Sequence, residues 1–473
     1  MLGSEKLTDT ALAYRGLNYK SLNDTVLATI INKRVLDIEN ISKEGQRTAP
    51  RASLYRALSV RGRRNFILEC KKSSPTLGDF CQDFNLDRIL ECYEKHASAI
   101  SVLCEPHFFK GSLDYLSYVK SRTRLPVICK DFIISEEQLT AANNAGADAV
   151  LLMLSVLSRD FFLELAKKAH ELGLEVLCEV DTYEDASFAI DHNLKIVGIN
   201  NRDLRTLKVD LGNAKKLYSL FDAATRVISE SGIHDHQQLV DLKPIRNFLI
   251  GSSLTGADNI EFKASSMLYG MNKICGLKTL EALDAAIAGH ASIAGLIFYQ
   301  KSPRSVSLDE ARALTDHGRG RISFAGVFVD EDPEVIINTA RALKLDFVQL
   351  HGSESVQMIE QLKKELPDTR IIKAVKVKDQ KSFDEASDYA QYCDFLLLDS
   401  PSPGSGAKFD WRHIPDFIDR NRTLLAGGIG PDNLDDALEQ RFLGLDLNSK
   451  LEKTKGVKDP AMIKEALDRL NRF

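Results

Sequence analysis

The feature that most constrains this chain is a regular alternation of short apolar runs with longer amphipathic stretches. In the first half, apolar runs of strand length occur eight times, at 66–70, 99–103, 127–129, 149–153, 175–178, 196–199, 226–229 and 248–250. The stretches between them, such as 86–96 and 159–172, have helical periodicity. Strands that alternate with helices form parallel sheets with crossover helices, and eight repeats favour closure into a (β/α)8 barrel.

The same alternation restarts in the second half. Eight further apolar runs lie at 273–275, 294–298, 323–328, 346–350, 371–374, 395–398, 423–426 and 444–447, after a helical segment at 260–269. We therefore predict an α/β protein of two tandem (β/α)8 TIM barrels. The expected domains are residues 1–262 and 263–473.

Extra segments precede the first barrel strand. A helical pattern runs over 24–38 with Asp24 as its candidate N-cap, and a short helix is expected at 53–58. Both helices are placed to cover the bottom or the rim of the first barrel. Residues 1–20 are polar, and we expect them to fray.

Composition excludes several classes of protein. The chain has 473 residues and a formal net charge of -5, so it lacks the basic footprint of a nucleic-acid-binding protein. No apolar run reaches the ~18 residues of a membrane span, and residues 1–20 lack the apolar core of a secretory signal, which predicts a cytoplasmic protein. Eight cysteines are scattered without C-x-x-C pairs, which argues against a metal site and against a disulfide framework. We expect a monomer.

Catalytic groups of a (β/α)8 barrel lie at the C-terminal ends of its strands. At the first such end, Glu69 and Lys71 stand two residues apart and so face the same side, although an ion pair at a strand edge is the alternative. Small residues after the seventh and eighth strands, Ser231-Gly232 and Gly251-Ser252, suit phosphate binding, with ordinary turns as the alternative. The other candidates at these ends are Ser74, Ser101, Lys130, Phe132, Glu179, Asn200, Arg202 and Glu230.

The strand ends of the second half carry a different set of groups. A cysteine and a carboxylate at two strand ends, Cys275 and Asp399, have the chemistry of a base and an acid on opposite sides of a sugar. Alternatively, Cys275 is a small core residue, Asp399 caps a loop and His351 is structural. The remaining candidates are Arg304, the phosphate-loop residues Gly406, Gly427 and Gly428, and the last pair, Asn448 and Ser449.

Several of these segments resemble a known family. The first half carries 66–75 FILECKKSSP, 129–132 CKDF, 197–204 VGINNRDL, 228–233 ISESGI and 249–252 LIGS. The second carries 273–276 KICG, 302–304 SPR, 349–352 QLHG, 398–399 LD, 404–406 GSG, 425–428 LAGG and 445–449 LDLNS. Together they resemble the bifunctional tryptophan-biosynthesis family, in which indole-3-glycerol-phosphate synthase is fused to N-(5'-phosphoribosyl)anthranilate isomerase. The likeness covers the chain from about Asp24 onward.

The resemblance implies substrates that join an anthranilate ring to a phosphorylated five-carbon sugar. The second half would isomerise N-(5'-phosphoribosyl)anthranilate by an Amadori rearrangement to 1-(2-carboxyphenylamino)-1-deoxyribulose 5-phosphate. The first half, a carbon–carbon lyase, would then close the indole ring with loss of CO2 and water. Neither step resembles a cofactor-dependent reaction, so no cofactor is expected.

The resemblance also implies roles for the first-half residues. Lys130 would be the general acid on the substrate carbonyl, and a desolvated lysine can have its pKa lowered toward the working pH. Glu179 and Glu69 would handle proton removal and dehydration, with Lys71 near the substrate carboxylate or as a second acid. Asn200 would orient the reacting hydroxyl. The phosphate would lie against Ser231, Gly232, Gly251 and Ser252.

In the second half, Cys275 would remove the C2' proton and Asp399 would protonate the ring oxygen as the furanose opens. Arg304 would contact the anthranilate carboxylate, and Gly406, Gly428, Asn448 and Ser449 would hold phosphate. A thiol needs a lowered pKa to be a useful base, and the sequence does not show what lowers the pKa of Cys275. The alternatives are a double barrel acting on other phosphosugars and a non-catalytic phosphosugar-binding pair of barrels.

A few positions depart from the commonest family pattern. Thr76-Leu77 stands where Ser-Lys is common, Lys301 stands where Thr is common, and 400–403 replaces a loop richer in glycine. These positions flank the reactive groups, so they bear on loop mobility and affinity rather than on the type of reaction.

Overall fold

The computed structural model describes residues 4–42, 44–203, 206–402, 404, 406 and 409–472. The chain divides into two compact units, the first ending at Ile260 and the second running from Glu261 to Arg472, with Asp235–Gln237 grouped with the second. The division lies in helix α13 (Ile260–Tyr269), close to the predicted boundary between 262 and 263. Of the residues in the motifs above, Leu204, Pro403 and Ser405 lie outside the described residues.

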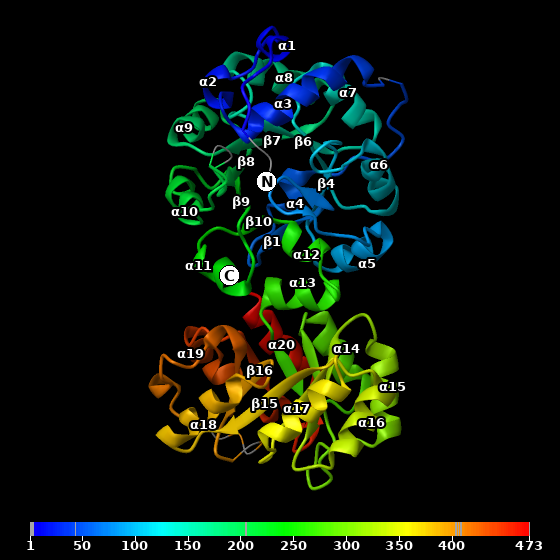
Figure 1. The fold of residues 1–473 in the computed structure, drawn as a ribbon, viewed down its shortest axis with the longest axis vertical. Coiled ribbons are helices and arrows are strands. Elements are labelled where there is room, and N and C mark those ends of the chain that lie inside the picture. The colour runs from blue at the N-terminus through cyan, green and yellow to red at the C-terminus, as the bar shows by residue number, and fades with distance from the viewer. Residues whose placement is uncertain are drawn as a thin grey trace. The chain divides into compact units, whose positions relative to one another are not determined.

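The first unit is a closed barrel of eight parallel strands, as predicted (Figure 1). The strands are β1 (Asn65–Cys70), β4 (Ala99–Leu103), β5 (Val127–Lys130), β6 (Ala149–Met153), β7 (Glu175–Val180), β8 (Ile196–Asn200), β9 (Arg226–Glu230) and β10 (Asn247–Ile250). The helices between and after them are α5 (Leu86–His96), α6 (Leu113–Arg122), α7 (Glu136–Asn144), α8 (Arg159–Glu171), α9 (Tyr183–Asp191), α10 (Gly212–Tyr218), α11 (His236–Asp241) and α12 (Ser252–Thr255). After β1, the segment that holds Ser74 forms a small hairpin of β2 (Ser73–Ser74) and β3 (Gly78–Asp79), which the periodicity did not predict.

The N-terminal segment is helical. It forms α1 (Asp9–Leu12), α2 (Tyr19–Leu22), α3 (Val26–Asp37), a 3-10 turn η1 (Ile38–Asn40) and α4 (Leu54–Ala57). The expectation that residues 1–20 fray is wrong for the described part, because α1 and α2 are formed and capped by Thr8 and Asn18. The cap of α3 is Thr25, whose side chain accepts the Ala28 N–H, and Asp24 lies just before it in left-handed backbone.

The two predicted N-terminal helices, α3 and α4, cover opposite ends of the first barrel. Val26, Leu27 and Ile30 of α3 line the cavity at the C-terminal ends of the strands. At the other end, Glu175 begins β7 and accepts hydrogen bonds from Ser53 Oγ at 2.8 Å and from the Leu54 N–H of α4. One helix therefore covers the rim that carries the site, and the other covers the bottom.

The second unit is also a closed barrel of eight parallel strands. They are β11 (Lys273–Cys275), β12 (Ile293–Ile297), β13 (Ser323–Phe328), β14 (Phe347–Leu350), β15 (Arg370–Lys376), β16 (Phe395–Asp399), β17 (Thr423–Leu425) and β18 (Gly444–Leu447). Around them lie α14 (Leu280–Ala288), α15 (Leu308–Gly318), α16 (Pro333–Leu343), α17 (Val356–Glu365), α18 (Gln380–Ala390), α19 (Leu434–Glu439) and α20 (Pro460–Leu470). In the described residues between β16 and β17 only 3-10 turns form, η2 (Trp411–His413) and η3 (Arg420–Arg422). Beyond β18 a short hairpin of β19 (Glu452–Thr454) and β20 (Val457–Lys458) precedes α20.

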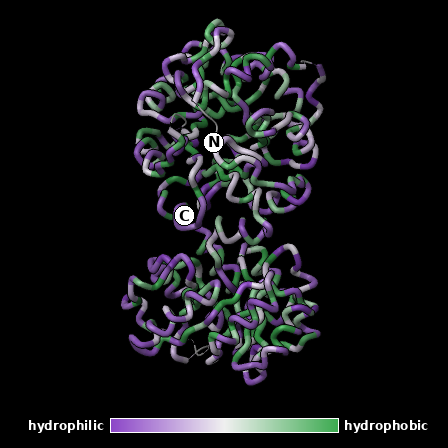
Figure 2. Tube along the Cα trace, in the orientation of Figure 1, coloured by the Kyte–Doolittle hydropathy of each residue, from purple (hydrophilic) through white to green (hydrophobic). Residues whose placement is uncertain are grey.

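The core of the second barrel has two layers. Outward-facing strand residues such as Ile274 and Val348 pack against the helices. Inside the barrel, Ile293, Phe347 and Leu397 belong to a separate apolar cluster that fills the interior. Figure 2 shows hydrophobic segments toward the inside of each unit and hydrophilic ones at many of the outer turns. Among the described helices, none is long and apolar enough to cross a membrane.

Candidate active sites

The strands of the first barrel end around a cavity of about 370 Å³. All five catalytic candidates of this half line it, namely Glu69, Lys71, Lys130, Glu179 and Asn200. The substrate candidates that line it are Ser74, Phe132, Arg202, Ser231, Gly232, Gly251 and Ser252. Of the described candidates, Ser101 and Glu230 are outside this lining. Both are buried, Ser101 paired in register with Glu69 and Glu230 in contact with Lys130.

Charged groups from four strands meet in this cavity. Lys71 Nζ lies 2.6 Å from Glu69 Oε1, so the two groups that face the same side do form an ion pair. Lys130 Nζ lies 2.6 Å from Glu230 Oε2 and 3.8 Å from Glu179 Oε2. Asn200 Nδ2 donates to Glu179 Oε1 at 3.2 Å. The pattern is therefore two lysines among three glutamates, all at one rim.

The charge state of Lys130 differs from the expectation. Burial by itself lowers the pKa of this lysine, but the carboxylates of Glu230, Glu179 and Glu69 outweigh burial and raise the pKa above its ordinary value. The prediction of a lowered lysine pKa is thus wrong. Lys130 is therefore an ammonium throughout the working pH range, so its proton is present for transfer to a substrate oxygen.

The pKa of Glu179, which lies near Lys130, is also raised above its ordinary value. Burial, which is the largest effect, raises the pKa of Glu179 to about 7, although the Lys130 charge and the Asn200 hydrogen bond lower it. A carboxylate with a pKa near neutrality is matched to general-base catalysis in a cell. Glu179 is therefore the group in this cavity best suited to take up a proton.

Two glycines make room for the carboxylates. A Cβ at Gly198 of β8 would overlap Glu230 Oε1, and a Cβ at Gly251 would overlap Glu69 Oε1. After β9, Ser231 and Gly232 both have left-handed backbone, with φ of 67° and 81°. Small side chains at these strand ends thus leave space for the acidic groups and for a ligand at the rim.

The roof of the cavity is apolar, and sequence reasoning missed most of it. It includes Val26, Leu27 and Ile30 from α3, while Leu151 and Leu249 line the cavity from the barrel strands β6 and β10. The amphipathic pattern of 24–38 predicted a helix but not which surface it covers. An apolar roof over charged walls suits a ligand with a flat ring at one end and an anionic group at the other.

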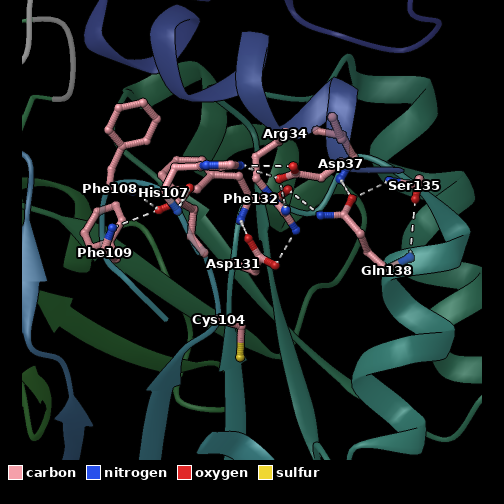
Figure 3. A network of polar contacts seen from close by, with 12 residues as sticks. Arg34, Asp37, Cys104, His107, Phe108, Phe109, Asp131, Phe132, Ser135 and Gln138 are labelled. Atoms are coloured by element: carbon pink, nitrogen blue, oxygen red, sulfur yellow. Dashed lines mark hydrogen bonds and ion pairs between the residues drawn. The ribbon is translucent and has the colours of Figure 1, made fainter. Parts of the chain in front are cut away.

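A polar network attaches α3 to this rim (Figure 3). Arg34 of α3 donates to Asp131 at 2.7 Å, immediately after Lys130 in the chain, and also binds Asp37. Asp37 lies 3.0 Å from His107 Nε2, and Glu105 accepts the N–H groups of residues 107, 108 and 109. Arg34 therefore connects the covering helix with the segment that follows β5, and Asp37 connects it with the segment that follows β4.

Replacing Arg34 by Met is expected to lower the free energy of unfolding of the first barrel by about 3–5 kcal/mol, because Asp131 would remain buried without its cation. Urea unfolding followed by synthase activity measures the change. The matched control is Arg15→Met, which removes an exposed pair with Glu164 and is expected to cost less than about 1 kcal/mol. Equal losses for the two variants would show that the Arg34 network does not hold the helix in place.

The second barrel has its own cavity of about 460 Å³ at the C-terminal ends of its strands. The candidates that line it are Cys275, Arg304, His351, Asp399, Gly427, Gly428, Asn448 and Ser449. In the described part of the 403–408 loop, Gly404 lines the cavity and Gly406 does not. Cys275 and Asp399, which the sequence places far apart, are thus brought to one cavity.

The two reactive candidates of this cavity have different surroundings. Asp399 Oδ2 lies 3.3 Å from His351 Nε2, and Gln349 Nε2 contacts His351 Nδ1 at 2.8 Å. Burial raises the pKa of the Cys275 thiol, and this effect is larger than the opposing effect of the Lys273 ammonium. Cys275 is therefore mostly a thiol in the free protein.

Arg304 is held on one edge by a residue that sequence reasoning missed. Its Nε and Nη2 bind the two oxygens of Glu452 at 2.6 and 3.0 Å. Glu452 also accepts from Lys458 Nζ at 2.6 Å, and Lys458 donates to Asn448 at 2.8 Å. Burial raises the pKa of Glu452, but the bonds from Arg304 and Lys458 prevail and lower it to about 2. The β19–β20 hairpin thus orders both a cavity arginine and a phosphate-loop candidate.

Comparison with known proteins agrees with this arrangement. Residues 24–267 match the family model for indole-3-glycerol phosphate synthase, and residues 272–469 match the model for N-(5'-phosphoribosyl)anthranilate isomerase. These matches decide against an unrelated pair of phosphosugar-binding barrels.

Three bacterial relatives, each described as tryptophan biosynthesis protein TrpCF, align along most of their length. The protein of Haemophilus influenzae is 38% identical over 92% of this chain and 96% of the relative. That of Yersinia pestis is 42% identical over 84% and 83%, and that of Vibrio cholerae is 37% identical over 96% and 98%. The chain therefore belongs to the bifunctional tryptophan-biosynthesis family that joins an indole-3-glycerol-phosphate synthase barrel to an N-(5'-phosphoribosyl)anthranilate isomerase barrel, and it is an enzyme with both activities.

Proposed function

We propose that Lys130 is the general acid of the synthase reaction and protonates the substrate carbonyl oxygen as the indole ring closes. The observation that supports this role is the position of its ammonium in the cavity, 2.6 Å from Glu230 and 3.8 Å from Glu179. Anionic neighbours keep the lysine charged until the substrate oxygen develops negative charge. Glu230 is thereby the residue that holds Lys130 in place.

Glu179 takes the proton that is lost as the ring becomes aromatic, because its pKa lies near neutrality. Asn200 holds Glu179 by a hydrogen bond and orients the hydroxyl group that leaves as water. Glu69 assists the dehydration, and its partner Lys71 faces the substrate carboxylate that leaves as CO2. Four groups thus share one decarboxylation and one dehydration.

The pH profile of the synthase tests the role of Glu179. The base must be ionised, so kcat/KM is expected to fall about tenfold per pH unit below about 7 and to level off above it. Asn200→Leu removes a hydrogen bond that lowers the pKa of Glu179, so this limb should move to higher pH. Glu179→Gln should lower the rate about 10²–10⁴-fold and abolish the limb. An unmoved limb in both variants would assign the base to another residue.

The substrate of the synthase fits the cavity by its two ends. The phosphate lies against Ser231, Gly232, Gly251 and Ser252, where small residues follow the seventh and eighth strands. The anthranilate ring lies under the apolar roof beside Phe132, with Ser74 and Arg202 at the cavity wall. Ser101 is buried on the adjacent strand β4, in register with Glu69, and its hydroxyl has no hydrogen-bond partner among the described residues.

In the second barrel, Cys275 removes the C2' proton and Asp399 protonates the furanose oxygen. Both residues line one cavity, as acid and base on two sides of a sugar require. His351 Nε2 lies 3.3 Å from the Asp399 carboxylate in the same cavity. Arg304, fixed by Glu452, faces the anthranilate carboxylate, and the phosphate lies near Gly427, Gly428, Asn448 and Ser449. Gly406 does not line the cavity but adjoins this group, because a Cβ there would lie 3.6 Å from Ser449 Oγ.

The synthase domain is proposed to comprise residues 1–262 and the isomerase domain residues 263–473. Each cavity is lined by residues of a single unit, which supports catalysis by a monomer. The free cysteines of the chain suit a reducing cytoplasm. Light scattering of the purified chain tests the monomer, and a tetramer or dimer would refute it.

A paired assay tests the assignment as a whole. Conversion of phosphoribosylanthranilate by the isomerase removes the anthranilate fluorescence, and ring closure by the synthase changes the absorbance as indole forms. Both signals are expected from one purified chain without added metal or cofactor. Loss of activity on treatment with a chelator would contradict this part of the proposal.

A further inference from the structure

A fully buried lysine lies beneath the isomerase cavity. Lys273 begins β11, is 0% exposed, and places Nζ 3.0 and 3.1 Å from the two carboxylate oxygens of Asp446. Lys273 and Asp446 are register partners on the adjacent strands β11 and β18. A buried ammonium is costly unless it is paired and used, and replacing such a pair by apolar residues is often neutral. Because stability alone does not explain this pair, we looked for a function of Lys273 in the cavity above it.

The geometry points toward Cys275. Residues two apart in a strand face the same side, so Lys273 and Cys275 both point into the barrel. On the neighbouring strand, Gly295 is the register partner of Cys275. A Cβ at Gly295 would lie 2.9 Å from Lys273 Cε and 3.0 Å from Cys275 Sγ. The end of the lysine side chain and the thiol thus occupy the same small space above Gly295.

The charges around Cys275 are mixed, and their order of importance is informative. After burial, the largest effect on its pKa is the lowering by the Lys273 ammonium, which also donates a hydrogen bond; Asp446 raises the pKa and Lys458 lowers it. The Lys273 pKa is raised, because Asp446 and Cys275 outweigh its burial, so the lysine stays charged. The other charged or titratable groups that line this cavity are Tyr299, which packs against Cys275, and Lys301, Arg304, His351, Lys376, Asp399 and Lys455.

We propose that Lys273 is the positioning residue of the isomerase base: its ammonium, anchored by Asp446 at the floor of the cavity, is the counter-charge of the Cys275 thiolate. This inference rests on the proposed role of Cys275. When the thiolate takes the C2' proton, the C–H bond breaks, its electron pair stays on the substrate, and an S–H bond forms. Lys273 loses no proton in this step. Its ammonium stabilises the Cys275 thiolate before the proton is transferred.

The first test measures the thiolate directly. In Lys273→Met, which has a similar length and no charge, the pH midpoint for iodoacetamide alkylation of Cys275 should rise by about one unit or more, a tenfold lower thiolate fraction at fixed pH. Mass spectrometry of the Cys275 peptide reports this residue separately from the other cysteines. The rising limb of the isomerase kcat/KM profile should move by the same amount. An unmoved midpoint and limb would overturn the proposal.

Two further variants separate this role from a structural one. Asp446→Asn removes the anion that competes for the ammonium, so the Cys275 midpoint should fall. Lys373→Met removes another buried lysine of the same barrel, paired with Glu354 at 2.9 Å and outside the cavity lining, and should leave the midpoint in place. A midpoint that moves equally in Lys273→Met and Lys373→Met would show a general loss of packing instead.

The single lysine variant leaves Asp446 buried without a partner, so it can fail to fold. The double variant Lys273→Met/Asp446→Leu removes both charges and is expected to fold. Because Lys273 affects Cys275 more than Asp446 does, its midpoint should still lie above that of the wild-type chain. A midpoint at or below the wild-type value would refute the inference.

Failure of the inference and failure of the proposed function give different results. If Cys275→Ala keeps normal isomerase turnover, Cys275 is not the base, whatever Lys273 does. If Cys275→Ala is inactive but Lys273→Met leaves the alkylation midpoint in place, only the role of Lys273 is wrong. Synthase turnover of the same samples confirms the amount of enzyme in each assay.

Discussion

Lys130→Met is expected to lower synthase turnover about 10²–10⁴-fold while isomerase turnover stays unchanged. The variant removes the ammonium that lies 2.6 Å from Glu230 and 3.8 Å from Glu179. The substrate carbonyl would lose its proton donor, and Glu230 would be left buried without its cation. Turnover is measured on the deoxyribulose phosphate substrate, so that the isomerase step does not limit the rate.

The matched control for this variant is Lys120→Met. Lys120 is also a buried lysine of the first barrel and binds Asp148 at 2.6 Å, but it does not line the cavity. Lys120→Met should lower the free energy of unfolding by less than about 3–5 kcal/mol, because Arg47 still pairs with Asp148 at 2.6 Å, and the folded fraction should keep its synthase turnover. Synthase turnover of Lys130→Met within tenfold of the wild-type value would remove Lys130 from the role of general acid.

Cys275→Ala is expected to lower isomerase turnover by about 10²–10⁴-fold and to leave the synthase unaffected. Alanine fills most of the space of a buried thiol but cannot accept the C2' proton. The loss of anthranilate fluorescence measures the first reaction. Supplying the isomerised intermediate then shows whether the synthase of the same chain still forms indole.

Cys393→Ala is the control for loss of a thiol from this barrel. Cys393 is equally buried but packs in the apolar layer between strands and helices, away from the cavity. Its isomerase turnover should match that of the wild-type chain. Normal turnover in Cys275→Ala would mean that another group takes the C2' proton.

Local periodicity was enough to predict the architecture. Runs such as 99–103 and 149–153 coincide with β4 and β6, because a strand buried on both faces is read as a continuous apolar stretch. Eight such runs with helices between them have few ways to bury their faces other than closure. The rim that carries the candidate residues followed from the same rule, since parallel strands end together.

The helix caps, and the surfaces that the helices cover, could be predicted from the sequence less well. Asp24 and Thr25 are both good N-cap residues. Only the folded backbone decides that Thr25 accepts the Ala28 N–H, while Asp24 adopts a left-handed conformation. Similarly, the pattern of 24–38 indicated a helix but not that Arg34 reaches Asp131, a residue nearly a hundred positions away. Such contacts depend on distances in space, which no local pattern encodes.

The sequence by itself determined the two barrels, the positions of the strand ends and the kinds of reactive group found there. Only the tertiary structure decided the charge states of those groups. Lys130 has a raised pKa because glutamates from three other strands surround it, and Cys275 lies above a buried ammonium because β11 places Lys273 two residues before it and β18 brings Asp446 alongside. A pKa depends on burial and on the distance between charges, and both are set when strands far apart in the chain close into one barrel.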